Sequence, residues 1–283
     1  MIATAPNEAA INAFIAQHAA IHALPDNAIR IIRMTNEPNC NTAQLYKQIS
    51  QDAALAARIM QAVNSAYYSL PKKISSLDHA ITFMGLRAVK EVTLSSTLAS
   101  ACKPVDLGKY TARDFWDHSL GVAVLARELA GQAKTVDPQE AFTAGMLHDV
   151  GLLLTTQSVP AKCVQIFTAA ETPGRPFTAV EHEVFKFDHA ELGGRLGDDW
   201  QFPPYMSAAI RFHHQPDQAP AEHHAICLLL HIADTFCCEA KVGFPLTCAG
   251  QQISDDQLEA AHVTREAVAK ISAKLRLLLR LYT

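Results

Sequence analysis

The sequence predicts an all-α protein, and three observations lead to that prediction. Apolar residues recur at helical spacing through most of the chain. Helix-capping residues (Asp, Ser and Thr) stand before many of these apolar runs. No stretch alternates apolar and polar residues for long enough to predict a β-strand. We therefore expect an N-terminal helical subdomain packed on a helical bundle, followed by a short helical C-terminal tail.

The first hundred residues divide into short helices separated by turns. Asp26 and Ser76 are the expected caps of two of these helices, and Ser50 or Asp52 is the cap where the third segment divides into two. Gly85 is expected to end the fourth helix, because glycine is a common helix stop. The predicted helices cover residues 7–22, 26–34, 43–64, 77–83 and 86–101.

The second half of the chain shows the same pattern. Gly151 is expected to end a buried, almost wholly apolar helix, and Glu181 to lie in the capping turn of a helix that Thr178 begins. Asp188 is the expected cap of the next helix. The predicted helices run from Thr111 or Asp114 to Leu129, over 141–151, over 162–171, from Thr178, from Asp188, from Pro203 to His214, over 220–234, and along an amphipathic tail over 254–282.

A break in the helical pattern at residues 104–109 marks the expected domain boundary. After it, the composition shifts toward aromatic residues and histidine. We predict four parts: an N-terminal helix over 1–22, an N-terminal helical part over 23–105, a histidine-bearing helical part over 106–240, and a helical tail over 241–283.

Composition excludes several classes of function. The chain has 283 residues, of which 49% are hydrophobic and 18% charged, as in ordinary soluble proteins. A net charge of -4 gives no electrostatic reason to expect nucleic acid or an anionic membrane as partner. We find no signal peptide and no apolar run that would span a bilayer. Seven cysteines without paired spacing fit reduced thiols, so we expect a cytoplasmic protein.

The buried helix over 141–151 carries an imidazole and a carboxylate side by side, at His148 and Asp149. Burying a carboxylate in apolar surroundings costs several kcal/mol unless a cation or hydrogen-bond donors compensate it. Neighbouring helical side chains point about 100° apart, so both can lean toward one ion beside the helix. The same pair also fits a core histidine bonded to a backbone carbonyl, beside an aspartate in the last turn.

The positions of the remaining histidines favour the interpretation that His148 and Asp149 bind a metal ion. Most of the thirteen lie in the second half of the chain, and several lie on different predicted helices beside apolar or small residues. The candidate ligands are His118, His148, Asp149, His189, His213, His214 and Asp234. Five imidazoles and two carboxylates suit a divalent metal, iron or manganese first and zinc as the alternative. They suffice for two ions bridged by one carboxylate. For His213 and His214, a solvated helix end is the alternative interpretation.

Other histidines and cysteines are expected to lie elsewhere. The histidines in polar surroundings are assigned to the surface: His182, His223, His224 and His262. His231 lies three residues before Asp234 on the same helix face, and it either supports a ligand or belongs to the core. The cysteines at 227, 237 and 238 are expected to be small buried apolar side chains.

The order His118, His148-Asp149, Asp234 resembles the HD superfamily of metal-dependent phosphohydrolases. A narrower resemblance, over roughly residues 20–235, is to the HDOD domain. It is carried by Asp52-Ala53-Ala54-Leu55-Ala56-Ala57-Arg58-Ile59, Asn64-Ser65-Ala66-Tyr67-Tyr68, Ile74-Ser75-Ser76-Leu77, Ala80-Ile81-Thr82-Phe83-Met84-Gly85-Leu86, Phe115-Trp116-Asp117-His118-Ser119 and Asp188-His189-Ala190-Glu191-Leu192-Gly193. The resemblance implies an all-helical output or scaffold module of bacterial signalling, with an HD-like bundle. Such domains often lack demonstrated activity and metal ligands.

This chain differs from that pattern because its HD ligand positions are filled. By resemblance, His118, His148, Asp149 and Asp234 match the four ligands of the core HD site. The additional ligands of dinuclear HD-GYP relatives are matched by His189, His213 and His214, with Asp149 as the bridge.

Other positions argue against catalysis. Leu152 stands where HD-GYP enzymes carry a lysine, and Gln215-Pro216-Asp217-Gln218 replaces their Gly-Tyr-Pro signature. A phosphate needs cationic or N–H partners, and Arg195 and Arg211 are the nearby cations that the sequence offers. Metal binding is therefore better supported than hydrolysis of cyclic dinucleotides.

Two hypotheses follow. The first is a cytoplasmic signalling module of HDOD type, with a retained metal site and a protein partner. The alternative is a working metal-dependent phosphohydrolase, acting on a phosphorylated small molecule. The missing lysine favours the first and the complete ligand set the second. No catalytic residue can be assigned, and neither nucleic acid nor membrane is expected as partner.

Overall fold

A computed structural model describes residues 7–19, 24, 26–35, 37, 40–65, 68, 70 and 72–279. Within these residues the chain forms α-helices joined by turns and short 3-10 segments. The β-type pairing found there is one isolated bridge between Leu107 and Tyr110, and no strand forms. The predicted all-α class is confirmed.

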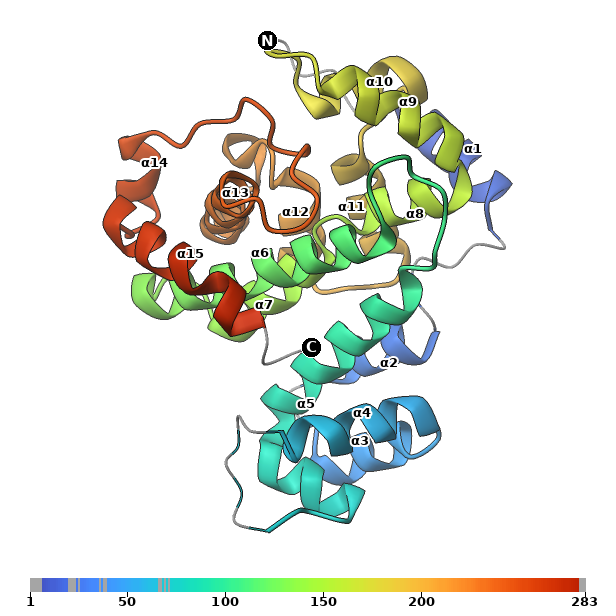
Figure 1. Ribbon diagram of the computed structural model, residues 1–283, viewed down its shortest axis with the longest axis vertical. Helices are drawn as coiled ribbons and strands as arrows, with labels where there is room; N and C mark the ends of the chain where they lie inside the picture. Colours follow the sequence, from blue (N-terminus) through green and yellow to red (C-terminus); the bar gives the residue numbers. More distant parts are fainter. Residues whose placement is uncertain are drawn as a thin grey trace.

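The N-terminal helices α2 to α4 and the first part of α5 form a small helical subdomain, at the bottom of Figure 1. Its apolar core is separate from that of the bundle and includes Leu45, Ile49, Ile59 and Ile81. The helix α1 instead packs on the bundle, where Phe14 contacts Phe185 and Phe187 edge to face. These helices are α1 (Glu8–Gln17), α2 (Asp26–Thr35), α3 (Thr42–Ile49), α4 (Ala53–Val63) and α5 (Leu77–Ala101).

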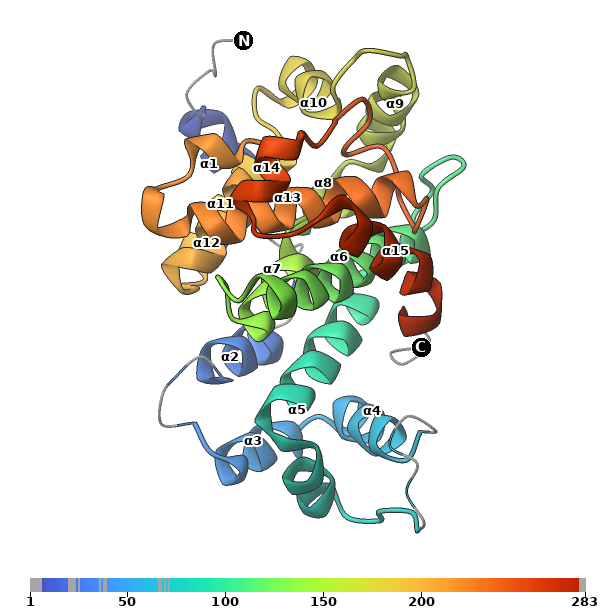
Figure 2. The same cartoon turned by 90° about the vertical axis from the view of Figure 1, so that its left-hand side faces the viewer.

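The rest of the chain forms the larger bundle (Figures 1 and 2). The last helix, α15, packs along α6. The helices of this part are α6 (Ala112–Ala133), α7 (Pro138–Leu147), α8 (Val150–Ser158), α9 (Pro160–Ala170), α10 (Phe177–Phe185), α11 (His189–Asp199), α12 (Pro204–Phe212), α13 (His224–Glu239), α14 (Asp255–Ala260) and α15 (Arg265–Leu279), with 3-10 turns at Pro216–Gln218 and Ala221–His223.

The helix α5 connects the two parts and bends at Gly85. This residue has φ 75° and ψ 166°, a backbone conformation that residues with a Cβ rarely adopt. Beyond the bend, Leu94 and Leu98 enter the core of the bundle. The helical conformation is broken at Gly85, where two helical pieces of α5 meet, so the predicted helix end there is confirmed.

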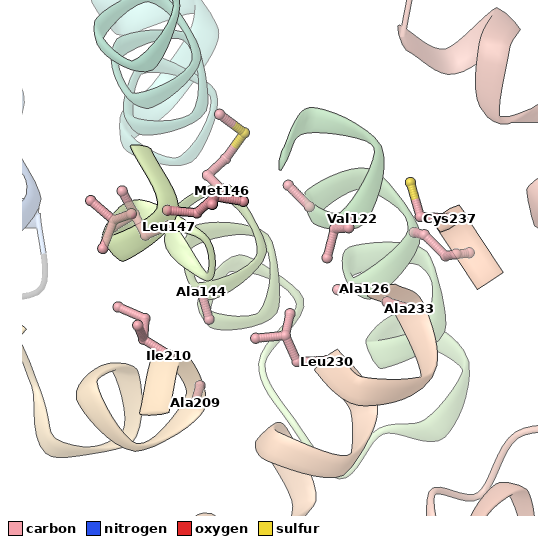
Figure 3. Close-up of a cluster of buried hydrophobic side chains, with 14 of the residues drawn as sticks. Val122, Ala126, Ala144, Met146, Leu147, Ala209, Ile210, Leu230, Ala233 and Cys237 are labelled. Atoms are coloured by element: carbon pink, nitrogen blue, oxygen red, sulfur yellow. The ribbon is translucent and has the colours of Figure 1, made fainter. Parts of the chain in front are cut away.

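The core of the bundle lies between α6, α7, α12 and α13, as Figure 3 shows. Val122, Leu147, Ile210 and Leu230 meet there and are almost completely buried. Burying an aliphatic side chain of this size contributes roughly 1.5–3 kcal/mol. These contacts fix the ends of α7 and α12, which directly precede pairs of candidate ligands.

Several predicted caps are confirmed. Asp52, Ser76, Thr111 and Asp188 each accept a hydrogen bond from the third residue of the helix that follows, and Thr111 and Asp188 form complete capping boxes. The predicted division of residues 43–64 into two helices is also confirmed.

Several predicted boundaries differ from the structure. Asp26 lies inside the first turn of α2, where a negative charge suits the helix dipole. Gly151 lies within α8, and its missing side chain lets the backbone of α11 approach at His189. Thr178 lies inside α10, which follows Pro176 without a side-chain cap. The tail consists of two helices, α14 and α15, rather than one continuous segment.

A few predicted positions lie outside the described residues. These are residues 20–22 of the first predicted helix, Ala66 and Tyr67 of the HDOD-like motif, and residues 280–282 of the tail.

Candidate metal centre

The seven candidate ligands come from five places in the fold and meet in the interior of the bundle. His118 lies in the middle of α6, and His148 and Asp149 lie between α7 and α8. The others are the first residue of α11, the two residues after α12, and a residue within α13: His189, His213, His214 and Asp234. All except His214 are buried.

Asp149 lies at the centre of this cluster. It occupies the N-cap position of α8, but its side chain makes no capping hydrogen bond, so both oxygens are free to face the cluster. Its Oδ2 lies 3.3 Å from His148 Nε2 and 3.6 Å from His118 Nε2. Its Oδ1 lies 3.2 Å from His189 Nε2 and 3.8 Å from His213 Nε2. The two oxygens thus face two different groups of imidazoles, as a bridging carboxylate would.

We call His118, His148, Asp149 and Asp234 the first group. Asp234 Oδ1 lies 3.1 Å from His118 Nε2 and 3.9 Å from His148 Nε2. The second group consists of His189, His213 and His214 with the shared Asp149. Here His214 Nε2 lies 3.0 Å from His189 Nε2. The ligand atoms of His118, His148 and Asp149 lie within 4.8 Å of one another, and so do those of His189, His213 and His214.

Hydrogen bonds at Nδ1 orient three of the imidazoles. His148 Nδ1 lies 2.8 Å from the Gly145 carbonyl oxygen, and His213 Nδ1 lies 2.7 Å from that of Ile210. His189 Nδ1 lies 2.6 Å from Glu181 Oε2. Because these acceptors require a proton on Nδ1, the Nε2 lone pair of each ring points into the cluster. That is the tautomer in which histidine binds a metal through Nε2.

The cluster contains buried polar atoms that the protein itself leaves without partners. His118 Nε2, His148 Nε2, His213 Nε2 and both carboxylate oxygens of Asp149 are buried and make no hydrogen bond. Buried polar groups are nearly always paired. Metal–nitrogen bonds of about 2.1 Å at right angles would place two nitrogens about 3.0 Å apart, as found for His189 and His214. The residues present therefore fit a divalent metal ion.

Among the protein groups alone, the cluster shifts the pKa of its carboxylates downward. Burial by itself would raise the pKa of Asp149, but the imidazoles of His148 and His189 hold it well below its ordinary value. The pKa of Asp234 is lowered in the same way, against burial, by His118 and His148. Both side chains therefore remain carboxylates, the form that coordinates a cation.

The pKa values of the imidazoles depend on burial and on the charges beside each ring. Burial opposes the charged form of His189, but Glu181 and Asp149 raise its pKa well above the ordinary value. Burial and the neighbouring His189 lower the pKa of His214 to about 4. The pKa of His213 falls because of burial and the adjacent His214. Neutral imidazoles at these two positions keep their lone pairs available to a metal.

Two further residues support the ligands. Glu181 is buried and accepts hydrogen bonds from both Nδ1 and the backbone N–H of His189. The prediction that Glu181 lies in a capping turn is wrong, because α10 begins without a side-chain cap and the Glu181 carboxylate accepts from His189 instead. No local signal identifies it, since the turn at Lys186 (φ 70°) brings the two residues together. His231 Nδ1 lies 2.7 Å from the His213 carbonyl oxygen, so His231 supports a ligand residue.

The other predicted histidines and cysteines lie mostly as expected. His262 is exposed, while His223 and His224 are half-exposed. His182 is half-buried and lies 3.4 Å from both Asp188 and Glu191. The cysteines of α13 are buried at positions 227, 237 and 238. Cys248, which no pattern in the sequence singled out, lies with its Sγ 2.8 Å from Asp234 Oδ2.

A cavity of about 760 Å³ leads from the surface to the second group. His214 and Cys248 form part of its wall, together with Asp188, Glu191 and Arg211. Arg211 Nη2 lies 2.6 Å from Asp198 Oδ2, and Arg195 Nε lies 2.9 Å from Asp199 Oδ1. Both candidate phosphate-binding cations are thus paired with carboxylates. Leu152 is buried within α8.

Within the described residues, every helix is too short or too polar to cross a membrane.

Known proteins resemble this chain in sequence and fold. A curated relative, an uncharacterized protein from Treponema pallidum (strain Nichols), is 25% identical over 204 residues; these cover 71% of this chain and 39% of the relative. This chain thus spans well under half of that protein.

Solved structures extend the likeness to nearly the whole fold. An HDOD domain protein of unknown function from Geobacter sulfurreducens has a TM-score of 0.73 and 24% identity, covering 95% of this chain and 97% of its own. A protein from Marinobacter aquaeolei VT8, provisionally named a signal transduction protein, has a TM-score of 0.80 and 22% identity, covering 97% and 63%. A Shewanella amazonensis SB2B protein, provisionally named a phosphohydrolase, has a TM-score of 0.70 and 24% identity, covering 93% and 94%.

The family model of the HDOD domain matches residues 21–216, more than half of the chain. That range includes six of the seven clustered side chains, while Asp234 follows it. The chain belongs to the HDOD domain family.

Proposed function

We propose that this protein is a cytoplasmic signalling module of HDOD type that retains a centre for two divalent metal ions and acts through a protein partner. The observation that carries the proposal is the position of Asp149. Its two oxygens face separate groups of imidazoles, at 3.3 and 3.6 Å on one side and 3.2 and 3.8 Å on the other. A purely structural carboxylate would be expected to take a hydrogen-bond donor on each oxygen.

His118, His148, Asp149 and Asp234 would hold the first ion. The second would be held by His189, His213 and His214, with Asp149 shared. Histidine nitrogens and carboxylate oxygens suit iron, manganese and zinc. When bound, such ions act as Lewis acids and lower the pKa of coordinated water.

The surroundings of the cluster favour a regulatory role over hydrolysis of a phosphorylated substrate. A phosphate ester needs cations or N–H donors that are free to receive it. Arg195 and Arg211 are paired with Asp199 and Asp198. Asp188 and Glu191 add negative charge to the cavity wall, which repels an anionic substrate.

One observation favours the alternative, a working metal-dependent phosphohydrolase. The cavity has the size of a small-molecule site and reaches His214 of the second group. An ion held there could be reached by a substrate from solvent. The two functions therefore differ in whether the metal-loaded protein turns over phosphate esters.

The test is metal analysis of protein purified without chelator, followed by a screen of phosphodiester and phosphomonoester substrates. We expect close to two ions per chain, fewer in Asp149→Asn, and little or no turnover. His223→Ala, at a half-exposed position outside the cluster, is the control and should keep both ions. Protein that binds no metal would refute the metal centre. Brisk hydrolysis lost in His148→Ala would refute the regulatory role and establish the phosphohydrolase.

A further inference from the structure

Two thiols lie against the metal-centre carboxylate Asp234, one beside each of its oxygens. Cys248 Sγ lies 2.8 Å from Asp234 Oδ2, and Cys238 Sγ lies 3.8 Å from Asp234 Oδ1. Both cysteines are buried, with 6% and 8% of their surface exposed. Their chemistry is not used by the imidazole and carboxylate ligand set described above.

The segment between α13 and α14 is anchored so that Cys248 reaches the cluster. Gly243 has φ 69°, and a Cβ there would collide with the backbone of α6 at Asp114 and His118. Phe244 N–H donates to the Asp114 carbonyl oxygen at 3.0 Å, and its ring stacks on that of Phe115 at 4.5 Å between centroids. These contacts tie the start of the segment to the helix that carries His118.

The far end of the same segment is tied to α13. Gln251 Nε2 donates a hydrogen bond to Thr235 Oγ1 on α13. Cys248 stands between these two anchors, and the short bends around it leave its side chain little freedom. Its position beside Asp234 is therefore set by the fold rather than by a mobile loop.

We propose that Cys248 is a thiolate ligand of the metal centre, beside Asp234, and that this sulfur makes the centre prefer zinc over manganese. One ligand atom each from His214, Asp234 and Cys248 lie within 4.8 Å of one another, so Cys248 stands where Asp234 of the first group and His214 of the second group come together. Buried atoms of the same cluster, including His213 Nε2, have no hydrogen-bond partner and are available to bind a cation. The inference rests on the proposed metal centre and specifies its ligands and its metal.

The chemistry of binding is simple. A metal–sulfur bond forms, and the thiol proton leaves to water in the cavity whose wall Cys248 and His214 share. Thiolate ligands favour zinc over manganese, which prefers oxygen donors. The nitrogen and oxygen ligands alone would accept iron, manganese or zinc, so the sulfur shifts the preference away from manganese.

Cys238 is the less favourable thiol, although one ligand atom each from His118, Asp234 and Cys238 also lie within 4.8 Å of one another. Its Sγ is a full 3.8 Å from Asp234 Oδ1 and lies 3.6 Å from Thr247 Oγ1, with which it can share a hydrogen bond. Cys248 is nearer to the carboxylate and reaches the open cavity. The two positions therefore give a matched pair for testing which sulfur binds.

The experiment is cobalt substitution of the full chain, read by the sulfur-to-cobalt charge-transfer absorption in the near ultraviolet. Wild type, Cys248→Ser, Cys238→Ser and Cys227→Ser are loaded with Co²⁺ alone, and cobalt content is measured in each. Cys227, buried on α13 with Asp234, is the control. We expect the band in wild type, Cys227→Ser and Cys238→Ser, and its loss in Cys248→Ser with cobalt still bound. Zinc affinity should fall at least about tenfold in Cys248→Ser, and under equal zinc and manganese its manganese share should rise.

The outcomes separate this inference from the proposed function. Cobalt bound by wild type without the charge-transfer band would leave the imidazole and carboxylate centre intact and refute the thiolate ligand. Loss of the band in Cys238→Ser alone would show that Cys238 supplies the sulfur ligand, and would refute the role of Cys248. No cobalt binding in any variant would refute the metal centre itself.

Discussion

Glu181→Gln is the most informative single substitution, because it changes a charge without changing shape. Glu181 is buried, and its Oε2 accepts from His189 Nδ1 at 2.6 Å and from His189 N–H at 3.2 Å. The glutamine carbonyl oxygen can accept both bonds, so the ring orientation and the tautomer of His189 are retained. What is lost is the negative charge that makes the imidazole a stronger donor to a metal.

The size of the effect follows from the kind of bond removed. A hydrogen bond to a charged group contributes about 1.5–3 kcal/mol, against about 1 kcal/mol for a neutral one. The difference, roughly 0.5–2 kcal/mol, corresponds to a loss of metal affinity of about threefold to thirtyfold. Outer partners of metal-bound histidines typically contribute 10–100-fold, so we expect about a tenfold loss at the second ion position.

The assay is a competitive zinc titration against a chromophoric chelator, with helical content followed by circular dichroism. Glu183→Gln removes the same charge two residues away on an exposed face of α10 and serves as the control. We expect weaker binding of one ion in Glu181→Gln, unchanged binding in Glu183→Gln, and native helicity in both. Equal affinities for both ions in Glu181→Gln and wild type would show that His189 binds no metal.

Three further substitutions test residues that support the site or the stability of the fold. Gly151→Ala should lower the melting temperature by several degrees and weaken binding of the second ion, because its Cβ would collide with the His189 carbonyl oxygen; a calorimetric scan beside metal analysis decides it. Leu152→Lys should destabilise the fold, since it places an ammonium at a buried position. The same variant should show no large gain in turnover of cyclic dinucleotides, and a sensitive phosphodiesterase assay measures that turnover. Burial lowers the pKa of Lys90 to about 8, with Glu140 partly opposing it. The unfolded chain therefore binds more protons above that pH, and the free energy of unfolding of wild type relative to Lys90→Met should rise by up to about 3 kcal/mol between pH 8 and pH 10.5 in denaturant titrations.

The parts of this structure that sequence predicted depend on local signals. Capping residues such as Asp52 and Asp188 accept hydrogen bonds from the backbone three residues away, so a short stretch of sequence is enough to predict them. Apolar periodicity likewise fixes which face of each helix is buried. The cluster of histidines was predicted because each stands among apolar residues and because its order resembles that of a known superfamily.

The parts that sequence missed depend on contacts made by the folded chain. Glu181 acts on His189 only after the turn at Lys186 reverses the chain. Gly151 resembles a helix stop, yet its lack of a side chain lets the backbone of α11 approach α8. Cys248 lies fourteen residues after Asp234, beyond the end of α13 at Glu239, and no spacing rule connects the two residues.

The two ion positions differ in how firmly the fold holds their ligands. In the first group, His118 and Asp234 lie inside long helices, and His148 and Asp149 follow the core residue Leu147 directly. Packing therefore places these ligands before any ion arrives. In the second group, His214 follows the end of α12 and lines the open cavity. A position held by packed helices loses less conformational entropy on binding than one completed by a residue beyond a helix end. The first position should consequently bind its ion more tightly, and the second should respond more to what enters the cavity.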